Sequence, residues 1–105
     1  MRQEYNALSS FGCVACRSND GFWEALADRP PANIHHIQGG KRKWWYVIPL
    51  CPDHHQHGEE AIHRNKKKFR AVYGDERELF IKVRNVMTVA GLWPEKIETE
   101  YQRGL

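Results

Sequence analysis

The sequence has no apolar run long enough to cross a bilayer, and its N-terminal residues, Met1-Arg-Gln-Glu-Tyr-Asn6, contain no apolar signal core. Cysteine is scarce: there are three in 105 residues. All three fall at spacings typical of metal ligands, which leaves none for a disulfide. These absences exclude a membrane-spanning protein, and we expect a soluble protein in the reducing cytoplasm.

The sequence also lacks internal repeats and the length for a second domain. Hydrophobic residues make up 41% of it, yet the mean hydropathy is −0.72, so a globular chain with a modest core is predicted. A core of this size often depends on a bound metal. We expect one domain over residues 1–105, with its core at about 8–90 and a tail at 91–105.

Periodicity and turn residues predict an α+β fold of helix, metal-binding turn, β-hairpin, helix and helix. The tail at 94–105 is polar and is expected to fray, and 18–33 is expected to be a loop with room for a helical turn at 23–27. Helices are predicted at 2–11, 52–56, 59–73 and 76–90, with Asp75 as the cap of the last one, and strands at 34–38 and 44–50 joined by Gly39-Gly40.

Two half-sites have the spacing of a structural zinc site. Cys13 and Cys16 form a C-x2-C turn, and Cys51 and His54 form a C-x2-H pair at the end of the predicted hairpin. Zinc in structural sites takes four cysteine and histidine ligands in a closed tetrahedron. The sequence therefore predicts a zinc ion that ties the N-terminal segment to the hairpin.

A second set of histidines remains after that site is complete. His35 and His36 are neighbours on a predicted strand, so their side chains point to opposite faces, and one can bind a metal while the other faces a substrate. A neutral imidazole is a competent general base at physiological pH. His55 and His63 are candidates to complete the ligands of this second metal, whereas His57 is expected to face solvent.

The formal net charge of +3 is modest, but the cations are clustered. The clusters fit either a solvated surface or a phosphate-binding surface, and their position beside the histidines strengthens the second interpretation. The candidate DNA-binding residues are Lys41, Arg42, Lys43, Arg64, Lys66, Lys67, Lys68 and Arg70.

The aromatic run Trp44-Trp45-Tyr46 directly follows the first basic cluster. On a strand these side chains alternate between faces, so one face is expected to pack into the core. The other face would expose an aromatic ring beside the cations, where it could stack on a base.

Several segments together resemble the phage recombination enhancement nucleases, which are described as RecA-dependent and share the HNH endonuclease core. The resemblance covers roughly residues 8–87 and rests on the combination of segments rather than on the histidine pair alone. The segments are Phe11-Gly-Cys-Val-Ala-Cys-Arg17, Asn33-Ile-His-His-Ile37, Ile48-Pro-Leu-Cys-Pro-Asp-His-His55, Ala61-Ile-His63 and Phe69-Arg-Ala-Val-Tyr-Gly-Asp-Glu-Arg-Glu-Leu79.

This resemblance implies a zinc-stapled ββα-metal fold and a metal-dependent DNA endonuclease. It implies that His35, His55 and His63 hold a catalytic divalent ion (Mg²⁺, Mn²⁺ or Zn²⁺), and that His36 is the general base that deprotonates the attacking water. Cleavage would leave a 5′-phosphate and a 3′-hydroxyl. DNA and a host RecA filament are the implied partners, in a phage- or prophage-encoded protein.

In one respect the sequence departs from the HNH pattern. That pattern has an asparagine in the second strand, where it supports the loop that carries the base, but the matching stretch here, 44–48, has none. Tyr46 or a backbone group is the expected substitute. Two other functions stay open: a non-catalytic zinc-stapled DNA-binding module, and a phage adaptor for a host recombination protein.

Overall fold

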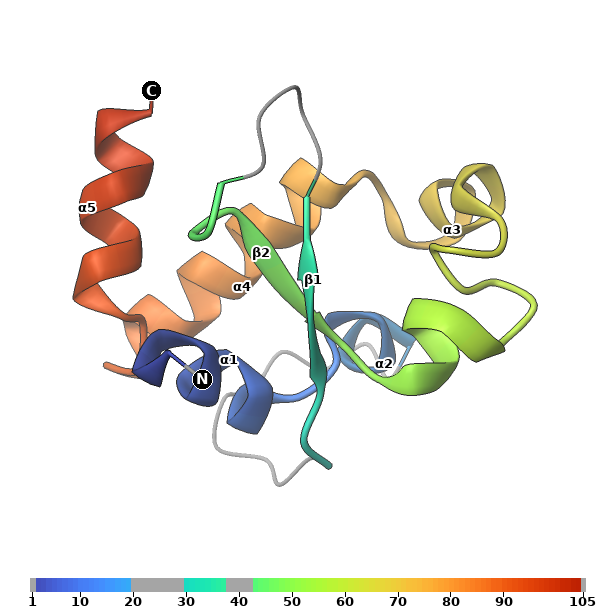
Figure 1. Cartoon of the computed structure of the whole chain (residues 1–105), viewed down its shortest axis with the longest axis horizontal. Helices are drawn as coiled ribbons and strands as arrows, with labels where there is room; N and C mark the ends of the chain where they lie inside the picture. Colours follow the sequence, from blue (N-terminus) through green and yellow to red (C-terminus); the bar gives the residue numbers. More distant parts are fainter. Residues whose placement is uncertain (1, 20–29, 38–42, 105) are drawn as a thin grey trace.

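The computed structural model describes residues 2–19, 30–37 and 43–104, and it arranges helices around one short β-hairpin (Figure 1). None of the helices in these residues is long and apolar enough to cross a membrane. In chain order the elements are α1 (Gln3–Phe11), α2 (Val14–Asn19), β1 (Asn33–His36), β2 (Val47–Leu50), the π-helix η1 (Asp53–His57), α3 (Lys66–Tyr73), α4 (Glu76–Val89) and α5 (Glu95–Arg103).

The hairpin lies at the centre of the molecule, with α4 crossing it and with α3 and α5 at opposite sides of the view in Figure 1. The strands β1 and β2 are antiparallel, and the register pairs His35 with Ile48 and His36 with Val47. Every residue of β2 is buried, because α1, α2 and α4 all pack against this strand. The predicted α+β class, an antiparallel hairpin with helices, is confirmed.

The apolar stripe of α4 supplies much of the core. Leu79, Phe80, Val83 and Met87 are all buried, and their spacing places them along one face of the helix. Asp75 begins this helix as predicted, since its side chain accepts a hydrogen bond from the Glu78 backbone N–H at 2.8 Å.

The predicted helix at 59–73 is wrong in its first half, because only α3 is helical there. Turns fill the residues before it: the Ala61 N–H donates to the Gly58 carbonyl at 3.1 Å, and the Ile62 N–H donates to the His54 carbonyl at 2.9 Å. Asn65 then starts a new helix by accepting a hydrogen bond from the Lys68 N–H at 3.1 Å. The helical periodicity of the sequence continues across the cap residue Asn65, and the predicted helix therefore began too early.

The tail predicted to fray is instead α5. Ile97 is fully buried in the main core cluster. Glu98 accepts hydrogen bonds from Arg84 Nε at 2.7 Å and from the Trp93 indole N–H at 2.9 Å, so the helix is fastened to α4 and to the turn before it. A polar helix with a single buried apolar residue lacks the apolar periodicity by which a packed helix is recognised in a sequence.

Other boundaries also moved. The strand predicted at 44–50 begins only at Val47, because the Tyr46 N–H closes a turn onto the Lys43 carbonyl at 3.2 Å. The strand predicted at 34–38 is β1, Asn33–His36. Residues 18 and 19, predicted as the start of a loop, belong to α2. The predicted helical turn at 23–27 and the Gly39-Gly40 turn lie outside the described residues.

Candidate functional site

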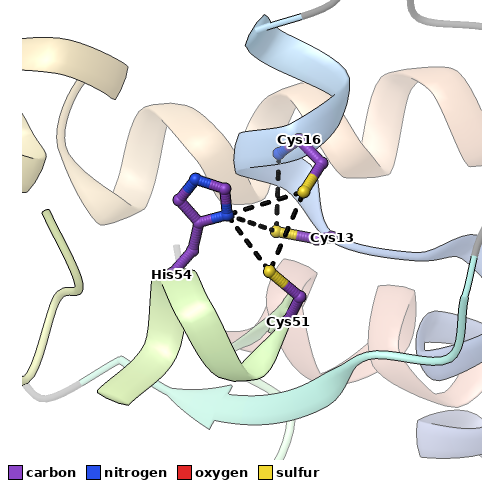
Figure 2. Close-up of side chains that lie close together, drawn as sticks. All are labelled: Cys13, Cys16, Cys51 and His54. Atoms are coloured by element: carbon purple, nitrogen blue, oxygen red, sulfur yellow. Dashed lines mark hydrogen bonds between the residues drawn. The ribbon is translucent and has the colours of Figure 1, made fainter. Parts of the chain in front are cut away.

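Three thiols and one imidazole converge where α2, β2 and η1 meet (Figure 2). The sulfurs belong to Cys13, Cys16 and Cys51. His54 points its Nδ1 at all three, at 3.5 Å from Cys13 Sγ, 3.5 Å from Cys16 Sγ and 3.1 Å from Cys51 Sγ. The two sulfurs of Cys16 and Cys51 lie 3.8 Å apart. The two predicted half-sites therefore form one cluster.

The spacing within this Cys₃His cluster fits zinc. Tetrahedral zinc, with Zn–S near 2.3 Å and Zn–N near 2.0 Å, keeps its sulfurs about 3.8 Å apart and a sulfur and a nitrogen about 3.5 Å apart. Burial raises the pKa of Cys13, and burial together with the neighbouring sulfurs raises the pKa of Cys16. Several charged thiolates at this spacing require a cation, so the donor set is compatible with a structural zinc ion.

A hydrogen-bond chain fixes the orientation of His54. Its Nε2 lies 3.0 Å from the Tyr73 hydroxyl, which also accepts a hydrogen bond from Asn19 Nδ2 at 3.0 Å and donates one to Glu60 at 3.3 Å. In this pattern the His54 Nε2–H donates to Tyr73, which leaves the Nδ1 lone pair for the metal. Burial lowers the pKa of His54, and the neutral imidazole that results is the form that binds a metal.

A second cluster contains only histidines. One ring nitrogen from each of His35, His55 and His63 lies within 4.8 Å of the others. His35 comes from β1, His55 from η1, and His63 from the turn that follows, whose N–H donates to the His55 carbonyl at 3.1 Å. The Nε2 atoms of His55 and His63 are 3.0 Å apart. Sequence reasoning grouped these three residues, and the structure brings them together.

The surroundings of His55 and His63 favour the neutral form of these two rings. Burial, together with the His35 and His63 rings, lowers the pKa of His55 to about 4, and burial and His35 also lower the pKa of His63. The Nδ1 atom of His55 is buried without a hydrogen-bond partner, which is rare for a polar atom in a protein interior. Neutral imidazoles with nitrogen atoms at this spacing are a suitable donor set for a divalent metal.

A buried carboxylate supports the cluster, and sequence reasoning assigned it no role. Glu76, at the start of α4, accepts a hydrogen bond from His35 Nε2 at 3.0 Å and is only 4% exposed. Lys66 and Arg70 of α3 contact its other oxygen at 3.2 and 3.4 Å. Burial alone would raise the pKa of Glu76, but the hydrogen bonds from His35 and Lys66 outweigh it and hold the pKa at about 2. Glu76 lies within one of the segments that resemble the nucleases, but no spacing rule singled it out.

His36 points away from that cluster toward α1. Its Nε2 lies 3.2 Å from the hydroxyl of Tyr5, which donates its own proton to the Trp44 carbonyl at 2.8 Å. The Tyr5 oxygen therefore accepts the His36 Nε2–H, so Nδ1 is the basic nitrogen of this ring. Tyr5 thereby links the His36 ring to the Trp44 backbone. The Tyr46 ring packs on Phe80, with the ring centres 5.1 Å apart.

Most of the predicted DNA-binding residues that the structure describes lie on or beside α3. Lys66 and Arg70 lie against Glu76, the exposed Lys67 and Lys68 lie between them on the same helix, and Arg64 donates to the His57 carbonyl at 3.0 Å. Lys43 lies apart from these, over the Trp45 ring at 5.3 Å. Lys41 and Arg42 lie outside the described residues. His57 is exposed, as expected.

Taken together, the hairpin, the Cys₃His cluster and the His₃ cluster define a small α+β domain with two groups of metal-competent side chains. Residues 1–88 match the model of a protein family described as recombination enhancement, RecA-dependent nuclease, and the chain belongs to this family. Comparisons with curated proteins and with solved structures give no match.

Proposed function

We propose that this chain is a metal-dependent DNA endonuclease of the HNH type, in which His35, His55 and His63 hold the catalytic ion. The convergence of these imidazoles from β1, η1 and the following turn carries the proposal. A hairpin followed directly by a helical turn that carries a metal-competent histidine is the arrangement of a ββα-metal fold. The family, named for its nucleases, supports this assignment.

A divalent ion at this position would neutralise the scissile phosphate and stabilise the leaving oxygen. Glu76 orients His35 by accepting its Nε2–H, and a carboxylate in this position also makes the imidazole a better electron donor. His63 is exposed, so the cluster opens to a substrate on that side. Catalytic sites keep such an open position, whereas structural sites are closed.

The role proposed for His36 is that of the general base. It removes the proton from the attacking water while Tyr5 holds its ring in place. Because Tyr5 is itself anchored to the Trp44 carbonyl, the ring is tied to the segment that leads into the second strand. We propose that this connection replaces the support that an asparagine gives in the HNH pattern.

Cations of α3 are proposed to bind the DNA backbone. Lys67 and Lys68 are exposed, and Lys66 and Arg70 place positive charge next to the His₃ cluster. Contacts of this kind give affinity without reading sequence. The family description suggests that cleavage takes place together with a RecA filament during recombination. We assign the activity to a single domain that includes α5, whose Ile97 belongs to the common core.

The test is nicking of plasmid and single-stranded DNA with added Mg²⁺ or Mn²⁺, with and without RecA filaments, by wild type and by His36→Ala. Loss of a general base lowers the rate by about 10²- to 10⁴-fold. The variant should keep DNA binding and should melt like wild type. Equal rates for the two proteins under every condition would overturn the proposal.

The same measurements decide between the other functions. A wild-type protein that binds DNA and never cuts it is the non-catalytic module. One that is retained on a RecA column without DNA, and neither binds nor cuts DNA alone, is the adaptor. Metal analysis adds a check independent of activity, since two ions per wild-type chain and one per His55→Ala chain are expected.

A further inference from the structure

A cavity outside the two clusters lies between the end of the hairpin connection, α4 and α5. Its volume is about 340 Å³, and its lining includes Lys43, Trp45, Tyr46, Arg77, Phe80 and Tyr101. This volume is near the lower end of the range for small-ligand sites, which run from roughly 300 to 1,000 Å³. It has room for one planar group of moderate size.

Aromatic rings form the wall of the cavity. Phe80 is fully buried at its centre, with its ring 5.1 Å from Tyr46, 5.4 Å from Tyr101 and 6.1 Å from Trp45. Tyr46 and Tyr101 are half-buried, so each ring contributes to the core and to the cavity surface. Tyrosine in this position offers a rigid apolar surface on which another planar group can stack.

The charged residues among the described lining are both cations. Lys43 Nζ lies 5.3 Å from the centre of the Trp45 ring, and Arg77 is exposed. Burial raises the pKa of Tyr46, and Arg77 acts against that rise while Asp75 and Glu76 add to it. An aromatic wall with cations at its rim is suited to a planar group attached to an anion.

A neighbouring cavity shows that aromatic lining alone does not give this chemistry. It has about the same volume, 370 Å³, and also contains a tryptophan, Trp93, but Glu95 and Glu98 line it. Glu98 is bound to Arg84 at 2.7 Å and to the Trp93 N–H at 2.9 Å. Its cation and its indole N–H are therefore already paired with a carboxylate, and Glu95 would repel an anion.

The cationic cavity and the His₃ cluster share the first turn of α4. Glu76 faces His35, and the next residue, Arg77, lines the cavity. On the hairpin side, the Tyr46 carbonyl accepts a hydrogen bond from the Ile37 N–H at 2.9 Å, next to the histidine pair of β1. A nucleic-acid strand lying across this end of the molecule could reach both places.

We propose that the cavity binds one unpaired base of the DNA strand, stacked on Tyr46 and Tyr101, with the adjoining phosphates held by Lys43 and Arg77. A paired base in a duplex cannot enter, so the cavity selects single-stranded or displaced DNA. This inference rests on the proposed function only in taking nucleic acid as the ligand, and it assigns a binding site separate from the histidines.

The test is fluorescence anisotropy with the full chain, without added divalent ion, on a labelled oligothymidylate and on an abasic strand of equal length and charge. Removing one stacked base costs about tenfold in affinity. Wild type should bind the abasic strand about tenfold more weakly, and Tyr46→Leu should bind oligothymidylate about as weakly as wild type binds the abasic strand. Affinity of Tyr46→Leu for duplex DNA should equal that of wild type.

Trp93→Leu is the matched control, because its ring also packs on Phe80, at 5.6 Å, but lines the acidic cavity. It should leave the preference for oligothymidylate unchanged. A strand with 5-bromouracil should crosslink, on irradiation, to the peptide that carries Tyr46 or to the one that carries Tyr101. Equal binding of the abasic strand, or crosslinks confined to other peptides, would overturn the proposal.

The outcomes also separate this site from the nuclease. If the protein binds DNA that carries bases more tightly than abasic DNA but never cuts DNA, the base site is supported and the proposed nuclease activity is contradicted. If the protein cuts DNA and shows no such preference, the nuclease activity is supported and the base site is contradicted.

Discussion

Each cluster takes one histidine from the π-helix η1, and these two histidines are neighbours in the sequence, yet the surroundings of the clusters differ. His54 joins three sulfurs that lie close together and are mostly shielded, whereas His55 joins two imidazoles, of which His63 is exposed. The first donor set is soft, closed and complete for zinc, and the second is neutral, incomplete and open. The difference supports the proposal that one site holds the fold and the other accepts a substrate.

The groups that hydrogen-bond the metal-competent histidines also differ between the two clusters. A neutral hydroxyl, that of Tyr73, positions His54, while an ionised carboxylate, that of Glu76, positions His35. Three thiolates already supply the charge that zinc needs in the first cluster. The second cluster has no anionic ligand among its imidazoles, so the carboxylate behind His35 supplies the negative charge.

The sharpest way to break this comparison is to remove one ligand from each cluster. Cys16→Ser should unfold the domain or abolish a cooperative melt, because structural zinc contributes about 10–16 kcal/mol of binding free energy to folding. His63→Ala removes an exposed side chain and should change the free energy of unfolding by about 0.5 kcal/mol or less. Thermal melting by circular dichroism, with zinc content by mass spectrometry, measures both. Two variants of equal stability would show that the Cys₃His cluster does not hold the fold.

The next largest effect concerns the carboxylate. Glu76→Gln keeps the shape of the side chain but removes its charge, and it should weaken Mn²⁺ binding at the His₃ cluster by about 10- to 100-fold. Calorimetric titration of the full chain measures this, and the zinc content should stay as in wild type. Glu78→Gln is the matched control, since it removes an exposed carboxylate from the same turn of α4. Equal Mn²⁺ affinity in both variants would contradict the role of Glu76.

The two clusters could be predicted because their ligands carry the signal in their own spacing: a C-x2-C pair, a C-x2-H pair and a histidine just beyond. The residues that hydrogen-bond these histidines could not be predicted. Tyr5 reaches His36 from 31 residues away, and Glu76 reaches His35 from 41, so these contacts exist only once α1 and α4 have packed on the hairpin. The docking of α5 was missed for the same reason, because it depends on Ile97 and on ion pairing with Arg84 rather than on an apolar stripe.

A smaller effect is expected from the tyrosine that holds the proposed base. Tyr5→Phe removes the hydroxyl between His36 and the Trp44 carbonyl, and it should lower kcat about two- to tenfold, since one such hydrogen bond contributes about 0.5–1.5 kcal/mol. KM and Mn²⁺ affinity should stay unchanged, because the cluster of metal-competent histidines does not include His36. The control is Ser9→Ala, which removes another hydroxyl-to-carbonyl bond made by α1, at 2.8 Å to Ala32. If the two variants lose activity equally, Tyr5 acts only through the packing of its helix.

The smallest effect is expected at the partner of His54. Tyr73→Phe removes the hydroxyl that bonds His54, Asn19 and Glu60. It should lower the free energy of unfolding by about 1 kcal/mol, because the exposed Asn19 and the half-buried Glu60 can bond water instead, so that the net loss is the bond to His54. Zinc should be retained, because the three sulfurs and the Nδ1 atom stay in place, while release of zinc to a chelator should become faster. The corresponding change at the other cluster, Glu76→Gln, acts on affinity itself, because there the lost group carries a charge. If Tyr73→Phe instead stripped the zinc, the hydroxyl would be as essential to its cluster as the carboxylate is to the other, and the contrast between a closed site and an open one would not extend beyond the ligands.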